Sequence, residues 1–110
     1  MSLVPLATED ALDSLVATGD LVVAYVSTAA CNVCKVLRPR VDEIVGRLGV
    51  AGAYVDATTL PQTAGQRLVF AVPTVLVYGD RRELARFGRH LSLEELEETL
   101  ARFQALMAES

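Results

Sequence analysis

The sequence is poor in side chains that bind metals: its 110 residues include two cysteines and one histidine. A structural zinc site needs about four such ligands. His90 falls in a different loop from the two cysteines, and we interpret it as a surface histidine rather than a general base. We therefore expect no metal within one chain, while a site shared between two chains stays open.

Long apolar runs and a surplus of basic residues are also missing. No apolar stretch reaches the roughly 18 residues that a membrane-spanning helix needs. The net charge is −4, whereas nucleic-acid-binding proteins carry a basic surface. Residues 1–5 lack the basic region and following apolar stretch of a secretory signal peptide. These absences predict a cytoplasmic protein that binds neither membranes nor nucleic acids.

The remaining composition is typical of a globular protein, with 52% apolar and 22% charged residues. A chain of 110 residues is long enough for one hydrophobic core and too short for two domains. The sequence shows no internal repeats, low-complexity stretches or linkers. We therefore expect one domain over residues 1–110, and a monomer.

Hydrophobic periodicity predicts alternating helices and strands, followed by a hairpin and a last helix. Residues 21–26 form a continuous apolar run rich in β-branched side chains, which is typical of a strand buried on both faces. Pro39 falls inside a long helical pattern and is expected to kink that helix without ending it. Further strands are expected at residues 53–56, 73–78 and 83–87, and helices after an N-cap at Thr8, at 31–48, at 61–69 and after an N-cap at Ser92.

This order of elements predicts an α/β fold with a central mixed β-sheet that is flanked by helices on both faces. In parallel parts of such a sheet, the functional loops gather at the carboxyl ends of the strands. Cys31 and Cys34 occupy that position, after the buried strand and at the start of the long helix.

The close spacing of Cys31 and Cys34 favours redox chemistry over a structural role. A disulfide between them closes almost no loop, so it adds little to stability. Without an export signal, a Cys-x-x-Cys pair is better read as a dithiol that opens and closes. The helix N-terminus stabilises the thiolate that attacks disulfides, which should lower the pKa of the Cys31 thiol. Cys31 is therefore the expected nucleophile, and Cys34, one turn further in, the resolving thiol.

The sequence resembles the thioredoxin family over nearly its whole length, which implies a thioredoxin-like fold. The run Ala-Cys-Asn-Val-Cys-Lys at residues 30–35 stands where family members carry Trp-Cys-Gly-Pro-Cys-Lys, and Pro39 matches the family's helix proline. Val72-Pro73-Thr74 matches the family's Ile-Pro-Thr, in which the proline is cis and faces the cysteines.

The resemblance implies a thiol–disulfide oxidoreductase that needs no organic cofactor. Its substrates would be protein disulfides, and its electrons would come from a reductase or another dithiol. A cis bond before Pro73 would leave the backbone of Val72 open to an extended substrate segment beside Cys31, with Thr74 and Ala30 in the same substrate-binding surface. The alternative is a redox-inactive module that only binds a partner, and the reactivity of Cys31 separates the two.

The sequence also departs from the family's pattern around the cysteines. Ala30 replaces the tryptophan, and Asn32-Val33 replaces the Gly-Pro. The family's buried aspartate and its nearby lysine, which assist proton transfer at the resolving thiol, align with Tyr25 and Gly52. The resemblance therefore implies slower turnover than that of an ordinary thioredoxin, with the dithiol itself retained.

Overall fold

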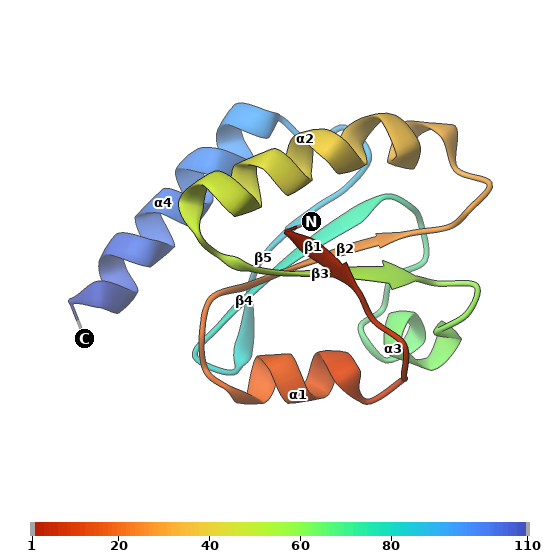
Figure 1. Ribbon diagram of the computed structural model, residues 1–110, viewed down its shortest axis with the longest axis horizontal. Helices are drawn as coiled ribbons and strands as arrows, with labels where there is room; N and C mark the ends of the chain where they lie inside the picture. Colours follow the sequence, from red (N-terminus) through yellow and green to blue (C-terminus); the bar gives the residue numbers. More distant parts are fainter. Residues whose placement is uncertain (1, 110) are drawn as a thin grey trace.

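The predicted mixed sheet with helices on both faces is confirmed by the computed structural model, which describes residues 2–109 (Figure 1). The elements in chain order are β1 (Leu3–Pro5), α1 (Ala11–Ala17), β2 (Val22–Ser27), α2 (Asn32–Leu48), β3 (Ala51–Asp56), α3 (Pro61–Gln66), β4 (Thr74–Gly79), β5 (Arg82–Phe87) and α4 (Leu93–Ala108). The five strands have the order β1-β3-β2-β4-β5. β1, β3 and β2 run parallel, whereas β4 pairs antiparallel with β2 and with β5.

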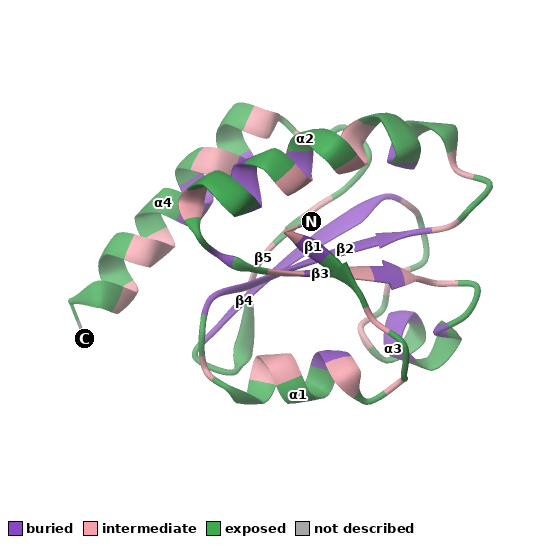
Figure 2. Ribbon diagram, in the orientation of Figure 1, coloured by how far each residue is buried: buried purple, intermediate pink, exposed green. Residues whose placement is uncertain are grey.

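The centre of this sheet is buried on both faces. All six residues of β2 and all six of β4 are buried (Figure 2). Because side chains alternate along a strand, Val23 and Tyr25 join the core under α2 and α4, while Val22 and Ala24 join the core over α1 and α3. The continuous apolar run therefore has the environment that its composition predicts.

The long helix α2 begins and ends as the sequence predicts. Cys31 is its N-cap, and Pro39 lies inside it. Gly49 ends the helix with a φ of 69°, in the left-handed region that glycine adopts without steric cost. The last helix is capped as expected, because the Ser92 hydroxyl accepts a hydrogen bond from the backbone N–H of Glu95 at 3.2 Å.

Other boundaries differ from the predictions. The N-cap of α1 is Asp10, not Thr8, whose hydroxyl instead donates to the Asp10 carboxylate at 2.6 Å. The helix α3 ends at Gln66 rather than at residue 69, because Leu68 adopts a φ of 57°. β3 begins at Ala51, two residues before its predicted start, because pairing with both neighbours extends it.

The first strand was not predicted from the sequence. β1 has only three residues, and a proline is one of them, so it carries no recognisable period. Its position depends on Asp42 of α2, whose carboxylate accepts hydrogen bonds from the backbone N–H groups of Ser2 and Leu3 at 3.1 and 3.0 Å. These bonds, with that of Leu3 first, hold the pKa of the Asp42 carboxyl below its usual value.

We predict that Asp42→Asn lowers the free energy of unfolding by about 1–2 kcal/mol at pH 7, because an amide of the same shape can accept only one of these two bonds. The folded-state pKa of Asp42 is lowered, so its contribution is fully present above about pH 5 and is lost as the pH falls through the lowered pKa. Urea denaturation at pH 7 and at pH 3 checks both statements.

The matched control for this experiment is Glu98→Gln, which removes an exposed carboxylate from α4. We expect it to change the free energy of unfolding by less than about 0.5 kcal/mol at either pH. Equal losses in the two variants would show that Asp42 acts through general charge and not through β1.

Candidate active site

Cys31 and Cys34 form a disulfide at the junction between β2 and α2, with their Cα atoms 5.2 Å apart. Cys31 is partly exposed, whereas Cys34 is only 2% exposed. The Sγ atom of Cys31 accepts a hydrogen bond from the backbone N–H of Cys34 at 3.1 Å, so sulfur fills the role that an oxygen usually has at an N-cap. The structure therefore places one accessible and one buried sulfur at a helix N-terminus.

The peptide bond between Val72 and Pro73 is cis, as predicted. Thr74 pairs with Val26 across β4 and β2, so Pro73 lies at the end of the sheet where β2 leads into the cysteine loop. Val72 and Cys31 both pack against the core under α2 and α4. The Val-Pro-Thr segment and the disulfide are thereby brought to the same end of the sheet.

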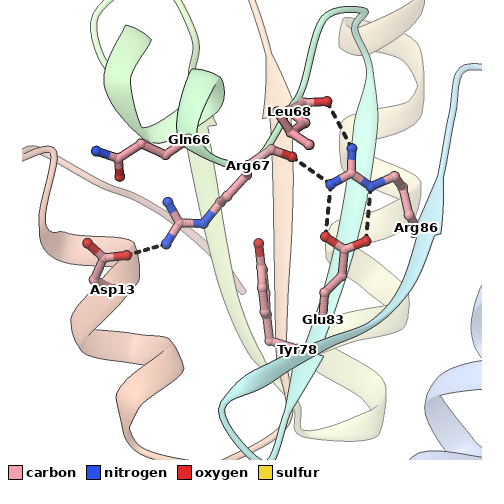
Figure 3. Close-up of a pocket in the computed structure, with 7 residues that line it drawn as sticks. All are labelled: Asp13, Gln66, Arg67, Leu68, Tyr78, Glu83 and Arg86. Carbon is pink, nitrogen blue, oxygen red and sulfur yellow. Dashed lines mark hydrogen bonds and ion pairs between the residues drawn. The ribbon is translucent and has the colours of Figure 1, made fainter.

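Arg86 of β5 holds in place the segment between α3 and β4, which leads to Pro73 (Figure 3). The guanidinium of Arg86 donates to the carbonyl oxygens of Leu68 and Arg67 at 3.0 and 2.6 Å. Glu83 accepts two hydrogen bonds from the same guanidinium, at 3.0 and 2.8 Å. Because a guanidinium is planar and presents its donors in a fixed fork, this arrangement orients the loop backbone.

Several exposed apolar side chains near the site were missed by the sequence reasoning. Val33 and Val36 are exposed in the first turns of α2, and Phe70 is 85% exposed three residues before Pro73. Ala30 is also exposed and adds only a methyl group beside Cys31. No signal in the sequence indicated the exposure of Phe70, since it stands in the apolar run Leu-Val-Phe-Ala-Val at residues 68–72, whose composition is typical of buried residues.

Two tyrosines lie behind the disulfide. The hydroxyl of Tyr25, buried in β2, donates a hydrogen bond to the carbonyl oxygen of Cys34 at 2.7 Å. Burial raises the pKa of Tyr25 to about 12, so it remains a neutral donor at physiological pH. Its ring stacks on that of Tyr54, its register partner in β3, with centroids 6.3 Å apart.

Two further side chains hold Tyr54 in place, one at its hydroxyl and one on its ring. Its hydroxyl shares a 2.7 Å hydrogen bond with the hydroxyl of Ser27, and the guanidinium carbon of Arg38 lies 3.6 Å from the centre of its ring. A cation at this distance from an aromatic face is attracted by the ring. Sequence reasoning missed this stack, because it depends on the parallel register between β2 and β3.

The remaining sequence candidates lie elsewhere. His90 is exposed in the turn between β5 and α4. Within residues 2–109, no three side chains of the His, Cys, Asp and Glu types lie close enough together to hold a metal ion. Over the same range, no helix has the length and apolar character needed to cross a bilayer.

Comparison with known proteins identifies the family. Residues 3–102 match the sequence model of the thioredoxin family. The chain belongs to that family. With a disulfide between its Cys-x-x-Cys cysteines, this thioredoxin-family protein is a thiol–disulfide oxidoreductase in its general class.

Individual relatives of this chain share a low sequence identity with it. The thioredoxin-like protein YdfQ of Bacillus subtilis is 29% identical over 83 residues, which are 74% of each chain. Thioredoxin 1 of Thermosipho africanus is 29% identical, with a TM-score of 0.74 over 79% of this chain and 98% of that one. The thioredoxin of Fasciola hepatica is 28% identical, with a TM-score of 0.81 over 91% and 98% of the two chains.

The structure gives a physical reason why this thioredoxin-family protein has glycine at position 52, where the family pattern has lysine. A Cβ atom at Gly52 would lie 2.5 Å from the backbone oxygen of Ser2 and 2.9 Å from a methyl group of Val45. Because the N-terminal segment and α2 approach the backbone so closely here, a lysine at this position would require both to move. The space behind the disulfide is instead filled by Tyr25, Tyr54 and Arg38.

We predict that Tyr25→Phe lowers the free energy of unfolding by about 1 kcal/mol, because it removes a buried hydrogen bond without changing the packed volume. Tyr78 supplies a matched control, since within residues 2–109 its buried hydroxyl makes no close hydrogen bond and has only a weaker contact with the Arg67 side chain. Tyr78→Phe should therefore lower the free energy of unfolding by less than Tyr25→Phe does. Chemical denaturation of the oxidised proteins measures both, and equal losses would contradict the role given to the Tyr25 hydroxyl.

Proposed function

We propose that the protein reduces disulfide bonds in protein substrates. The observation that carries this proposal is the disulfide at the N-cap of α2, with Cys31 partly exposed and Cys34 buried. In the reduced protein, the Cys31 thiolate attacks a substrate disulfide, forms a mixed disulfide and releases one substrate thiolate. Cys34 then loses its proton and attacks the Cys31 sulfur, which releases the second substrate thiolate and restores the observed disulfide.

The N-terminus of α2 supports the nucleophilic role of Cys31. Free N–H groups and the helix dipole stabilise an anion at this place. The backbone N–H of Cys34 already donates to the Cys31 Sγ atom at 3.1 Å, and such a bond becomes stronger when the sulfur is charged. Both effects stabilise the thiolate form of Cys31 in the reduced protein, which is the form that attacks disulfides.

Substrate binding is assigned to the surface formed by Val72, Pro73, Thr74 and Ala30. In this proposal, an extended substrate segment pairs with the backbone of Val72, which lies at the same end of the sheet as Cys31. The buried Thr74 hydroxyl donates to the carbonyl oxygen of Ala71 at 2.7 Å, so this side chain shapes the surface from within. Arg86 holds the earlier part of the same loop through the carbonyl oxygens of Leu68 and Arg67.

Turnover is expected to be slower than in thioredoxins with the full family pattern. Tyr25 donates to a backbone carbonyl and stays protonated, so it cannot take the proton of Cys34 as a carboxylate would. Ala30 offers little contact area to a docked substrate. We further propose a single-domain monomer in the cytoplasm that receives its electrons from a reductase or another dithiol.

We predict that Cys31→Ser abolishes reduction of a model protein disulfide, because it removes the attacking thiolate. Cys34→Ser should accumulate mixed disulfides with the same substrate, because no thiol is left to resolve them. Turnover with a supplied dithiol and non-reducing gel electrophoresis followed by mass spectrometry report the two outcomes. No turnover in the wild type and no trapped adduct in Cys34→Ser would support the binding-module alternative.

We predict that Ala30→Trp lowers the KM for a protein disulfide by about two- to fivefold, which corresponds to an added aromatic contact of about 0.5–1 kcal/mol. A small aromatic disulfide reagent serves as the control substrate, because it does not extend over the surface beside Cys31. Its rate should not change in the variant. A similar gain for both substrates would indicate a change in the reactivity of Cys31 and not in docking.

A further inference from the structure

A cavity of about 330 Å³ opens beside the disulfide, between the ends of β2 and β3 and the first turns of α2. Cys34 forms part of its wall, together with the hydroxyl groups of Ser27 and Thr28, the ring of Tyr54 and the cationic side chains of Lys35 and Arg38. Among residues 2–109, no carboxylate lines it. The polar side chains around this cavity are therefore hydroxyls and cations, all of which can donate hydrogen bonds.

The two cations of the cavity are not paired with acids. Over residues 2–109, the ion pairs with an arginine are made by Arg47, Arg67 and Arg86, and neither Lys35 nor Arg38 takes part in one. Arg38 is half-buried, and its guanidinium lies on the Tyr54 ring with the central carbon 3.6 Å from the centroid. This stacking occupies the face of the guanidinium and leaves its N–H edges available to a planar acceptor.

The two chain segments that form most of this end of the sheet carry no acidic residue, although Asp56 at the end of β3 is the register partner of Ser27. None of the 14 acidic residues lies in residues 21–41 or 57–79, the two segments that carry the cysteines and the Val-Pro-Thr sequence. Those segments hold four basic residues, although the chain as a whole has a net charge of −4. Asp42 and Asp56 border the segments, and their carboxylates accept hydrogen bonds from the backbone N–H groups of Leu3 and Thr58, respectively.

We propose that this cavity binds the carboxylate of an aspartate or glutamate that lies within two or three residues of the reactive cysteine in the substrate. This inference rests on the proposed function, because the substrate is held in place by its sulfur on Cys31. The cavity wall includes Cys34, the disulfide partner of Cys31, and consecutive Cα atoms are about 3.8 Å apart, so the substrate residues near the cavity are those close in sequence to the reactive cysteine. A carboxylate is planar and fits the free N–H edge of the guanidinium.

The size of the expected preference follows from the exposure of the cations. Partly exposed ion pairs contribute about 0.2–1 kcal/mol, which corresponds to a factor of up to about five. An acidic peptide disulfide should therefore be reduced with a kcat/KM about two- to fivefold higher than its amide counterpart. The preference should decrease as salt is raised from 10 mM to 1 M, because the Debye length falls from about 30 to 3 Å.

The test compares two disulfide-linked peptides that differ only in Glu or Gln at two residues from the cysteine. Wild type should prefer the acidic peptide, and Arg38→Gln and Lys35→Gln should each reduce the preference, with none left in the double variant. Arg40→Gln is the matched control, because it removes the same charge from an exposed position on α2 outside the cavity. Arg38→Lys should retain part of the preference, because it keeps the charge and loses the planar fork.

A binding experiment makes the outcome independent of turnover. The oxidised protein is titrated with the same peptides after their cysteines are replaced by serine, and NMR chemical shifts of Lys35 and Arg38 are followed. Tighter binding of the Glu peptide supports the proposal even if no peptide is reduced, in which case the proposed reductase function fails and the site remains. Free glutarate tests a diffusible anion as the ligand: binding as tight as that of the Glu peptide would overturn the peptide assignment.

Three further results would overturn the proposal. Equal kcat/KM values and equal affinities for the Glu and Gln peptides would show that the cavity does not recognise a carboxylate. A preference that persists in the double variant would place the recognition elsewhere. An equal loss in Arg40→Gln would show that only the overall charge of this end of the molecule matters.

Discussion

Burial of β2 on both faces is the constraint on which the rest of the molecule depends. Because none of its six residues can face water, helices must cover both sides of the sheet, and β3 and β4 must flank it. The chain leaves the sheet at the carboxyl end of β2 and continues into α2. The disulfide, the cis-proline loop and the tyrosine stack all lie at that end of β2, so a single buried strand determines where the chemistry lies.

Features that depend on local sequence were the most predictable. The apolar run of β2, the cap at Ser92 and the persistence of α2 through Pro39 follow from spacing and side-chain type, and each is present in the structure. β1 was missed because three residues carry no period, and its place depends on Asp42, far away in the sequence. Thr8 was a reasonable cap by composition, but its hydroxyl bonds to Asp10 instead.

The candidate site shows the same division between local and long-range information. The cysteine spacing and its place after a buried strand were sufficient to predict a redox-active cysteine pair, and the resemblance of Val72-Pro73-Thr74 to the family's Ile-Pro-Thr predicted the cis bond. The surroundings of Cys34 were not predictable, because the stack of Tyr25 on Tyr54 and the position of Arg38 result from pairing between separate elements. The alignment with the family indicated that the groups which assist proton transfer at Cys34 are missing. The structure shows a packed aromatic cluster in their place.

The tyrosine pair has a consequence for how the protein can be observed. The chain has three tyrosines and no tryptophan, so its ultraviolet emission comes from tyrosine alone. Tyr25 is bonded to the backbone of Cys34 and stacked on Tyr54, whereas Tyr78 lies in the core on the opposite face of the sheet. Two of the three tyrosines therefore lie next to the disulfide that opens and closes. Their fluorescence gives the protein an optical reporter of its own redox state without any label.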